Sequence, residues 1–321
     1  MRQWGSLCLL MVVLVTFSGA RTEHVPEVAH LLKAACKGDI NAQFMLGVAY
    51  EFGRGVVQDF AEAARWYQKA ADAAHPGAQA HLGNLYAQGR GVARDQIAAA
   101  KWYLRAAVRG DSVAQTNLGC MYFNGEAGLR QDYNEAARWF TRAADQHNPL
   151  AEANLATLYF EGWGLQRDPG KAASLYLEAA RQGNLYSQIR LAWIYEHGVG
   201  RHQDFAESLK WDRAAAQHGY PLALNNLGYL YEHGLGVPRD FPEAARLYCE
   251  AASSDLREAQ YNWQRIHASI KGLPEDCTEA ARWLGRVLPQ GLGNPSQSIE
   301  AGPQAPVSAP LTSGALVSEE R

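Results

Sequence analysis

The chain has 321 residues, of which 47% are hydrophobic and 20% are charged, so it has enough apolar material for a folded protein and too little charge for a fully disordered one. Thirty basic residues stand against thirty-three acidic ones, which gives a formal net charge of −3. Because nucleic-acid-binding proteins use a basic excess to neutralise phosphates, this balance argues against general nucleic-acid binding.

Residues 1–20 have the layout of a secretory signal peptide. Arg2 supplies a positive charge, residues 7–17 are uncharged and mostly apolar, and Ala20 ends a run of small residues. We expect cleavage after Ala20 and a bacterial protein outside the cytoplasm, either periplasmic or secreted. An uncleaved membrane anchor is the alternative, but the apolar run is short of the roughly twenty residues that span a bilayer. No later stretch is long enough, so we expect no membrane insertion after signal removal.

Four cysteines remain after the signal peptide, namely Cys36, Cys120, Cys249 and Cys277. They allow three pairings, and no Cys-x-x-Cys spacing selects one of them. We expect mostly buried thiols, with a Cys249–Cys277 disulfide as the alternative. The chain has no Asn-x-Ser/Thr glycosylation site free of proline, which favours a bacterial export route.

A unit of about 36 residues recurs seven times over residues 42–288 and loosens in its last copy. Three columns of residues keep this spacing in phase. The columns are Leu46, Leu82, Leu118, Leu155, Leu191, Leu227 and Trp263; Asp59, Asp95, Asp132, Asp168, Asp204, Asp240 and Asp276; and Trp66, Trp102, Trp139, Leu175, Trp211, Leu247 and Trp283. Their agreement predicts seven tandem repeats.

Each repeat is expected to fold as two helices joined by a tight turn. Apolar residues between Ala78 and Tyr86 fall at i, i+4, i+7 and i+8, which places them on one face of a helix. Glycines 89 and 91 end that helix, since glycine readily adopts the left-handed conformation. Asp95 then caps the next helix by accepting amide hydrogens. In five of the seven units a glutamate follows the aspartate by three residues, which predicts a capping box.

A single helical hairpin cannot cover its apolar stripe, so neighbouring hairpins must stack. We therefore predict an all-α fold, a right-handed α-solenoid with a concave inner face. Residues 21–41 are expected to form a capping half-repeat at its start. Residues 289–321 are rich in proline, glycine, serine and alanine and are expected to form a disordered tail.

The repeat pattern resembles that of a known family. Residues 78–107 read Ala-x-x-x-Leu-Gly-x-x-Tyr-x-x-Gly-x-Gly-Val-x-x-Asp, followed by Ala-x-x-Trp-Tyr-x-x-Ala-Ala, which is similar to the Sel-1-like repeat, a relative of the tetratricopeptide repeat. Departures include Ala156 and Ala192 in place of the glycine, and Leu175 and Leu247 in place of the tryptophan. The resemblance implies a protein–protein interaction scaffold, often in signalling or at host–microbe and envelope interfaces, but it implies no particular partner.

No catalytic or cofactor-binding motif is recognisable. The recurrent Gly-x-Gly resembles part of a nucleotide-binding loop, but a helix rather than a strand precedes it and the third glycine is absent, so we interpret it as a connecting loop. Gly-x-x-x-x-Gly-Lys-Ser/Thr, His-Glu-x-x-His and Gly-x-Ser-x-Gly do not occur. One cysteine-rich branch of the family is linked to β-lactam binding and hydrolysis, but this chain lacks its cysteine pair in each repeat and has no Ser-x-x-Lys. We predict no catalytic residues and no cofactor.

His197 and His233 occupy equivalent positions in adjacent repeats, where they and a carboxylate are candidates for zinc ligands. The simpler interpretation is that similar repeats carry similar polar residues at a helix end, so no metal site is predicted. The tryptophan column is expected to lie in the core rather than to stack on bases, and we predict that Trp102→Ala costs about 3–5 kcal/mol.

The face of each first helix opposite its Ala/Leu/Tyr stripe is expected to line the concave groove, by alignment with the tetratricopeptide pattern. Asparagine can pair with a peptide backbone, and tryptophan and tyrosine are common binding anchors. The candidate partner-binding residues are His81, Asn84, Asn117, Asn154, Arg190, Trp193, Asn226 and Tyr229. The alternative for the asparagines is that they bond neighbouring helices.

The sequence thus predicts an exported, non-enzymatic adaptor that binds a protein or peptide in its groove. A cell-envelope enzyme, or a peptidoglycan- or carbohydrate-binding accessory to one, is the alternative. Turnover of a chromogenic β-lactam would distinguish the enzyme from the adaptor.

Overall fold

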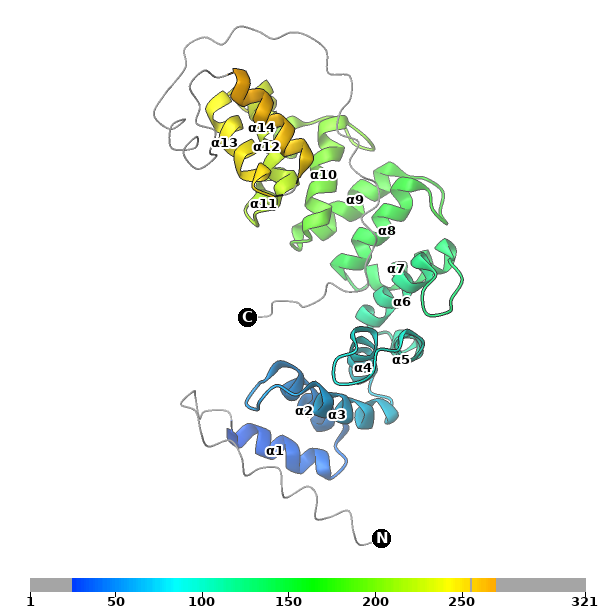
Figure 1. Cartoon of the computed structure of the whole chain (residues 1–321). Helices are drawn as coiled ribbons and strands as arrows, with labels where there is room; N and C mark the ends of the chain where they lie inside the picture. Colours follow the sequence, from blue (N-terminus) through cyan, green and yellow to red (C-terminus); the bar gives the residue numbers. More distant parts are fainter. Residues whose placement is uncertain (1–24, 255, 270–321) are drawn as a thin grey trace. The chain divides into compact units, whose positions relative to one another are not determined.

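The computed structural model describes residues 25–254 and 256–269, and these residues form fourteen helices and no strand (Figure 1). The predicted signal peptide, the predicted tail and most of the seventh repeat lie outside the described residues. The described helices fall into two compact units that meet in sequence between Asn148 and Pro149. Each unit is described separately below.

The first unit holds seven helices: α1 (Val25–Cys36), α2 (Ile40–Phe52), α3 (Phe60–Asp72), α4 (Pro76–Gln88), α5 (Gln96–Val108), α6 (Ser112–Asn124) and α7 (Tyr133–Ala144). The second unit holds α8 (Pro149–Glu161), α9 (Pro169–Arg181), α10 (Leu185–His197), α11 (Phe205–Ala216), α12 (Pro221–His233), α13 (Phe241–Ala252) and α14 (Arg257–Ser269). Within each unit every helix packs against the next one along the chain. This succession of hairpins confirms the predicted all-α solenoid class.

The single helix α1 precedes the first complete hairpin and packs against it. Its partly buried Val28 and Leu31 contact a cluster that includes Leu46 of α2 and Trp66 of α3. No helix among residues 25–254 and 256–269 is both long and apolar enough to cross a bilayer.

The Gly-x-Gly pairs are connecting loops, as predicted. Gly89 has a φ of 70° and closes α4 by donating its N–H to the carbonyl of Leu85. Gly91 lies against the start of α3, where an added Cβ would come within 2.2 Å of the backbone carbonyl of Phe60. The second glycine is therefore required by the close approach of two repeats, not by a ligand.

Aspartates cap the second helices, but the predicted capping box is only half formed. Asp59 accepts the backbone N–H groups of Ala61 and Glu62, as expected. The N–H of Asp59 donates to the carbonyl of Tyr50 instead of to the glutamate, because the tight turn already brings that carbonyl within reach. The glutamate side chain instead pairs with a basic residue one turn later. Such pairs are Glu62–Arg65, Glu135–Arg138, Glu207–Lys210 and Glu243–Arg246.

The tryptophan column lies at the packed side of the second helices, and Trp66, Trp139 and Trp211 are buried. Trp102 is only half-buried, with the guanidinium of Arg105 4.5 Å from its ring centroid. The expected core position of this column thus holds fully for Trp66, Trp139 and Trp211 and only in part for Trp102.

The most deeply buried position is the residue directly after the tryptophan column, which we call the ring column. Its members are Tyr67, Tyr103, Phe140, Tyr176, Asp212 and Tyr248, all of them at most 1% exposed. The glycine of the Leu-Gly motif packs on this ring: a Cβ added to Gly83 would lie 2.7 Å from ring carbons of Tyr103. In four repeats this glycine makes room for an aromatic side chain, whereas the fourth repeat accommodates Ala156 in the same cluster as Tyr176.

The cysteines differ in state. Cys120 is a buried thiol, as expected, whereas Cys36 is an exposed thiol because it ends α1 at the surface of the first unit. Cys249 is disulfide-bonded, in agreement with the alternative that the sequence left open for this residue. Cys277 lies outside the described residues.

Candidate functional site

Hydrogen bonds join most members of the ring column to polar side chains on the first helices of the repeats. We call this side of the first helices, α2, α4, α6, α8, α10, α12 and α14, the network face. In the first hairpin the hydroxyl of Tyr67 donates to Oε2 of Glu51, at 2.5 Å. Nδ1 of His81, from α4, lies 2.8 Å from the same oxygen. Burial, followed by the charge of Glu51, raises the pKa of Tyr67 far above its usual value. His81 therefore takes part in a packed network between two repeats.

The next hairpin uses asparagine for the same purpose. The hydroxyl of Tyr103 donates to Oδ1 of Asn84 at 2.7 Å, and Nδ2 of Asn117 donates to the same atom at 3.1 Å. Asn117 is 7% exposed. These two asparagines bond neighbouring helices, which is the alternative that the sequence left open.

In the second unit Asn154 of α8 is only 1% exposed, so it presents almost no surface to a ligand. Arg190 of α10 is better placed but is engaged within the unit. Its Nη2 lies 3.7 Å from Oε1 of Glu161, and its guanidinium carbon lies 4.6 Å from the ring centroid of Phe160 and 5.7 Å from that of Trp193.

The sixth repeat shows the most complete version of the network. The hydroxyl of Tyr248 donates to Oε2 of Glu232 at 2.8 Å, and Arg265 of α14 donates to both carboxylate oxygens at 2.6 Å. Burial by itself would raise the pKa of Glu232, but the hydrogen bonds from Arg265 and Tyr248 outweigh it and hold the pKa below its usual value.

The fifth repeat departs from this arrangement, because Asp212 replaces the aromatic ring. The Asp212 side chain is completely buried, and its Oδ1 accepts a 3.2 Å hydrogen bond from Nδ2 of Asn226. Its Oδ2 has no hydrogen-bond partner among the described residues. Burial raises the pKa of Asp212 well above its usual value, and the nearby carboxylate of Glu196 raises it further, against the bond from Asn226.

Trp193 and Tyr229 stand at equivalent positions of α10 and α12, and each packs on a histidine one turn later. The Trp193 ring lies 4.4 Å from that of His197, and the Tyr229 ring lies 4.2 Å from that of His233. Tyr229 is 40% exposed, whereas Trp193 is partly buried. Burial, then the charges of two glutamates, raises the pKa of Tyr229. These two rings are among the aromatic side chains of the second unit whose surface is accessible to a ligand, as is that of Tyr186, which is 39% exposed.

The zinc interpretation of His197 and His233 gains no support from the geometry. Nδ1 of His197 lies 3.0 Å from the backbone carbonyl of Trp193, and Nδ1 of His233 lies 2.9 Å from that of Tyr229, so both nitrogens are within hydrogen-bond distance of the backbone. Within the described part of the chain no group of three or more histidine, cysteine, aspartate or glutamate side chains is arranged to hold a metal ion.

The structure thus gathers Arg190, Trp193, Asn226 and Tyr229 on α10 and α12, while His81, Asn84 and Asn117 belong to networks in the first unit. The sequence analysis missed Asp212 and Glu196. The sequence could have revealed Asp212, since it is the only non-aromatic residue of the ring column between residues 67 and 248.

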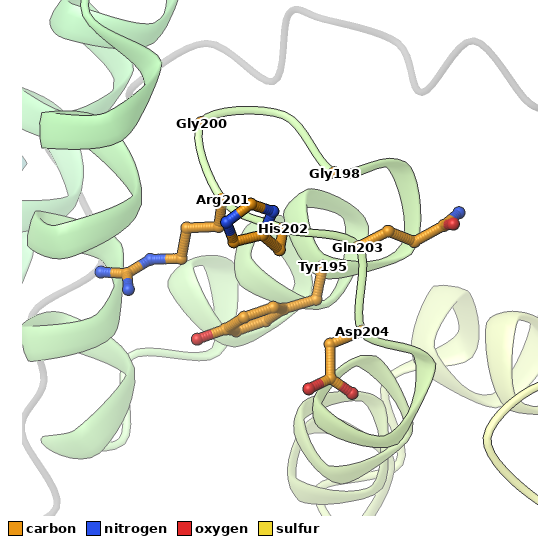
Figure 2. A pocket seen from close by; sticks show the side chains of 7 residues that line it. All are labelled: Tyr195, Gly198, Gly200, Arg201, His202, Gln203 and Asp204. Carbon is orange, nitrogen blue, oxygen red and sulfur yellow. The ribbon is translucent and has the colours of Figure 1, made fainter.

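An open depression of about 670 Å³ lies at the loop between α10 and α11 and is shown in Figure 2, lined by Tyr195, Gly198, Gly200, Arg201, His202, Gln203 and Asp204. Its polar side chains hold the loop itself. Arg201 and Gln203 extend in opposite directions, toward the hydroxyl of Ser174 at 3.1 Å and the carbonyl of Glu196 at 2.7 Å. Asp204 caps α11. We interpret this depression as the connecting loop of a repeat, not as a binding site.

Comparison with protein families gives six consecutive matches to the model described as Sel1 repeat. The matched segments are residues 40–75, 76–111, 112–148, 149–184, 185–220 and 221–256. No curated protein matches the chain. The match ends before α14, so the predicted seventh repeat extends beyond it.

Two solved structures share substantial sequence identity with the chain. A protective antigen, c5321, present in uropathogenic Escherichia coli strains and displaying an SLR fold, is 33% identical with a TM-score of 0.70, over 79% of this chain and 54% of that one. A Sel1 repeat protein from Oxalobacter formigenes is 33% identical with a TM-score of 0.62, over 71% of this chain and 98% of that one. The chain therefore spans about half the length of the first relative.

Proposed function

Because the chain belongs to the Sel1 repeat family, whose members are commonly protein-interaction scaffolds, we propose that it is a non-enzymatic adaptor that binds a protein or peptide. The observation that carries this proposal is the contrast along the network face. Most of its polar side chains are engaged with one another, whereas Trp193 and Tyr229 of the second unit leave aromatic surface accessible. Partly exposed aromatic side chains of this kind are typical anchors of binding interfaces.

We further propose that the ligand lies along α10 and α12, in the predicted groove, and contacts Trp193, Tyr229 and the exposed part of Asn226. Arg190 positions Trp193 from the adjacent turn. We leave Asn117 and Asn154 out of this surface, because side chains that are 7% and 1% exposed cannot reach a ligand without a rearrangement.

Export of the protein is part of the proposal and is supported by the charged, apolar and small segments of residues 1–20. The name of the uropathogenic relative, a protective antigen, is compatible with a protein outside the cytoplasm. The compartment is then the periplasm or the medium of a bacterial cell.

No particular observation favours the enzyme alternative. The chain has no Ser-x-x-Lys, and among the described residues no serine on the network face is hydrogen-bonded to a histidine or carboxylate. Turnover of a chromogenic β-lactam by the purified chain would overturn the non-enzymatic proposal.

The adaptor proposal is tested by affinity capture from envelope and medium extracts with residues 21–321. A Trp193→Ala/Tyr229→Ala variant removes the accessible rings, and an Ile97→Ala/Leu104→Ala variant removes two exposed apolar side chains of α5 as a matched control. We expect a specific protein to be retained by the wild type and the control and lost by the Trp193/Tyr229 variant. Equal capture by all three proteins would place the site elsewhere.

A further inference from the structure

The fifth repeat carries three buried polar substitutions that the other described repeats lack. Asp212 replaces an aromatic ring, and Ser187 and Ser208 replace alanines. Asp212 and Ser208 are four residues apart on α11 and so share one face of that helix. Oγ of both serines and Oδ2 of Asp212 are buried without a hydrogen-bond partner in the described residues. Unpartnered buried oxygens are costly, so their concentration in one repeat indicates a use other than stability.

Because Asp212 stands in place of a tyrosine of the ring column, Glu196 also lacks the hydroxyl that would donate a hydrogen bond to its carboxylate. Glu196 aligns with Glu51 and Glu232, whose carboxylates each accept a tyrosine hydroxyl from the ring column. The half-buried Glu196 carboxylate has no hydrogen bond or ion pair among the described residues. Burial raises the pKa of Glu196 against the favourable effect of His197 and His233. The position therefore combines two carboxyl groups, Glu196 and the more deeply buried Asp212, with too few donors.

Glu196 also has no ion pair among the described residues, although His197 and His233 lie near enough to lower its pKa against the larger effect of burial. Elsewhere on the network face a carboxylate is paired with a cationic or protonatable side chain from the next first helix. These pairs are Glu51–His81, Glu161–Arg190 and Glu232–Arg265. For Glu196 the next first helix is α12, which offers neutral Asn226 and Tyr229 at the corresponding positions. Comparison with these three pairs indicates that the group Glu196 lacks is a cation in direct contact with its carboxylate.

The surroundings of Glu196 suit an organic cation. Trp193 lies one turn before Glu196 on α10, and the charge of Glu196 raises the pKa of Tyr229 on α12, so Tyr229 lies near the carboxylate. Aromatic faces attract ammonium and guanidinium groups. The chain uses such contacts itself, since the guanidinium of Arg190 lies 4.6 Å from the ring centroid of Phe160.

We propose that Glu196, backed by Asp212, binds a lysine or arginine side chain of an extended peptide segment between Trp193 and Tyr229. This inference rests on the proposed adaptor function and specifies its ligand. Glu196 contacts the cation, the two rings flank it, and Asp212, in place of a tyrosine ring, leaves Glu196 without a competing hydroxyl donor. The ligand takes the place that Arg265 occupies beside Glu232 in the next repeat.

The test uses a random nonapeptide display library selected on residues 21–321. We expect enrichment of lysine or arginine at one position of the selected peptides. Binding of the best peptide is then measured by calorimetry and compared with the same peptide carrying norleucine at that position, which keeps the chain length and removes the charge. We expect the norleucine peptide to bind about tenfold more weakly or worse.

Peptide binding to charge-removing variants tests where the basic side chain of the peptide binds. Glu196→Gln keeps the size of the side chain and removes its charge, so it should weaken binding of the basic peptide while leaving binding of the norleucine peptide nearly unchanged. Glu207→Gln, on the outer turn of α11 where Glu207 pairs with Lys210, is the matched control and should change neither affinity.

The possible failures are distinguishable. Selected peptides without a basic preference, or a basic peptide whose affinity is unaffected by Glu196→Gln, would overturn the cation site while leaving peptide binding intact. A library that yields no peptide at all would overturn both the site and the peptide-binding function.

Discussion

The amide of Asn226 donates a 3.2 Å hydrogen bond to Asp212, a completely buried carboxyl group at a position where the other described repeats bury an aromatic ring. Asn226 belongs to the repeat after Asp212, so the bond joins two hairpins across the network face. The remaining Asp212 oxygen has no partner among the described residues, and the neighbouring Glu196 lacks the tyrosine hydroxyl that its counterparts accept. Asp212, in place of a tyrosine in the core, therefore leaves the partly exposed carboxylate of Glu196 without a hydroxyl donor.

Gly83 should be intolerant of a methyl group, because the Tyr103 ring lies directly against it. In Gly83→Ala the new Cβ would lie 2.7 Å from two ring carbons of Tyr103, so either the ring or α4 must shift. We expect a loss of about 1–3 kcal/mol in the free energy of unfolding, measured by urea denaturation. In the matched Gly83→Ala/Tyr103→Ala variant the added methyl should cost little relative to Tyr103→Ala. An unchanged midpoint for Gly83→Ala would contradict the packing account.

Tryptophans of the same column should differ in sensitivity. Trp139 is 7% exposed, whereas Trp102 is half-buried. We expect Trp139→Ala to cost about 3–5 kcal/mol and Trp102→Ala distinctly less, because less apolar surface is lost. Thermal or urea unfolding of both variants provides the comparison, and the reverse order would show that the burial of this column is wrongly assigned.

Removal of a single hydroxyl from the ring column tests the polar network. Tyr248→Phe keeps the ring but takes a donor from the buried Glu232, which retains Arg265. We expect a loss of about 1–3 kcal/mol. Tyr261→Phe, at a tyrosine that is 61% exposed, is the control and should leave the unfolding curve unchanged. Equal stability of the two variants would mean that the Tyr248 hydroxyl contributes nothing.

The buried carboxyl of Asp212 should make stability depend on pH. Because its pKa is raised in the folded chain, the folded state holds the proton more strongly than the unfolded state. The associated stability is present below the ordinary carboxyl pKa of about 4 and is lost as the pH rises toward the folded value. Asp212→Asn should therefore be more stable than the wild type at about pH 7, and the difference should shrink toward about pH 4.

Urea unfolding of wild type and Asp212→Asn at several pH values measures this difference. A difference that grows as the pH falls would contradict the direction assigned to Asp212.

The helices and their ends were predictable from the sequence because each depends on residues close together in the chain. The 36-residue period, the Asp95 cap and the glycine at residue 89 follow local rules that act in the same way in each repeat. The capping box failed because the Asp59 N–H has a closer acceptor in the Tyr50 carbonyl, which only the folded turn brings near.

The candidate site was harder to predict, since it depends on contacts between repeats. Asn84 and Asn117 were assigned to a ligand on their polarity, but the hydroxyl of Tyr103 and their own mutual bond hold them within the fold. Trp193 and Tyr229 were identified because large rings at those positions are unusual. Asp212 was missed because the tryptophan column, rather than the more deeply buried column beside it, was taken as the centre of the core.

The central claim is that the fifth repeat gives up stability to create a ligand site, and the Asp212→Tyr/Ala192→Gly variant tests it most directly. This variant restores the ring and the facing glycine that the sixth repeat has in Tyr248 and Gly228. The measurement is calorimetric titration of the wild type and the variant with the selected basic peptide, together with urea unfolding of both. We expect the variant to be more stable by about 2 kcal/mol and to bind the peptide about tenfold more weakly or worse. A stabilised variant that binds the peptide as tightly as the wild type would contradict the account.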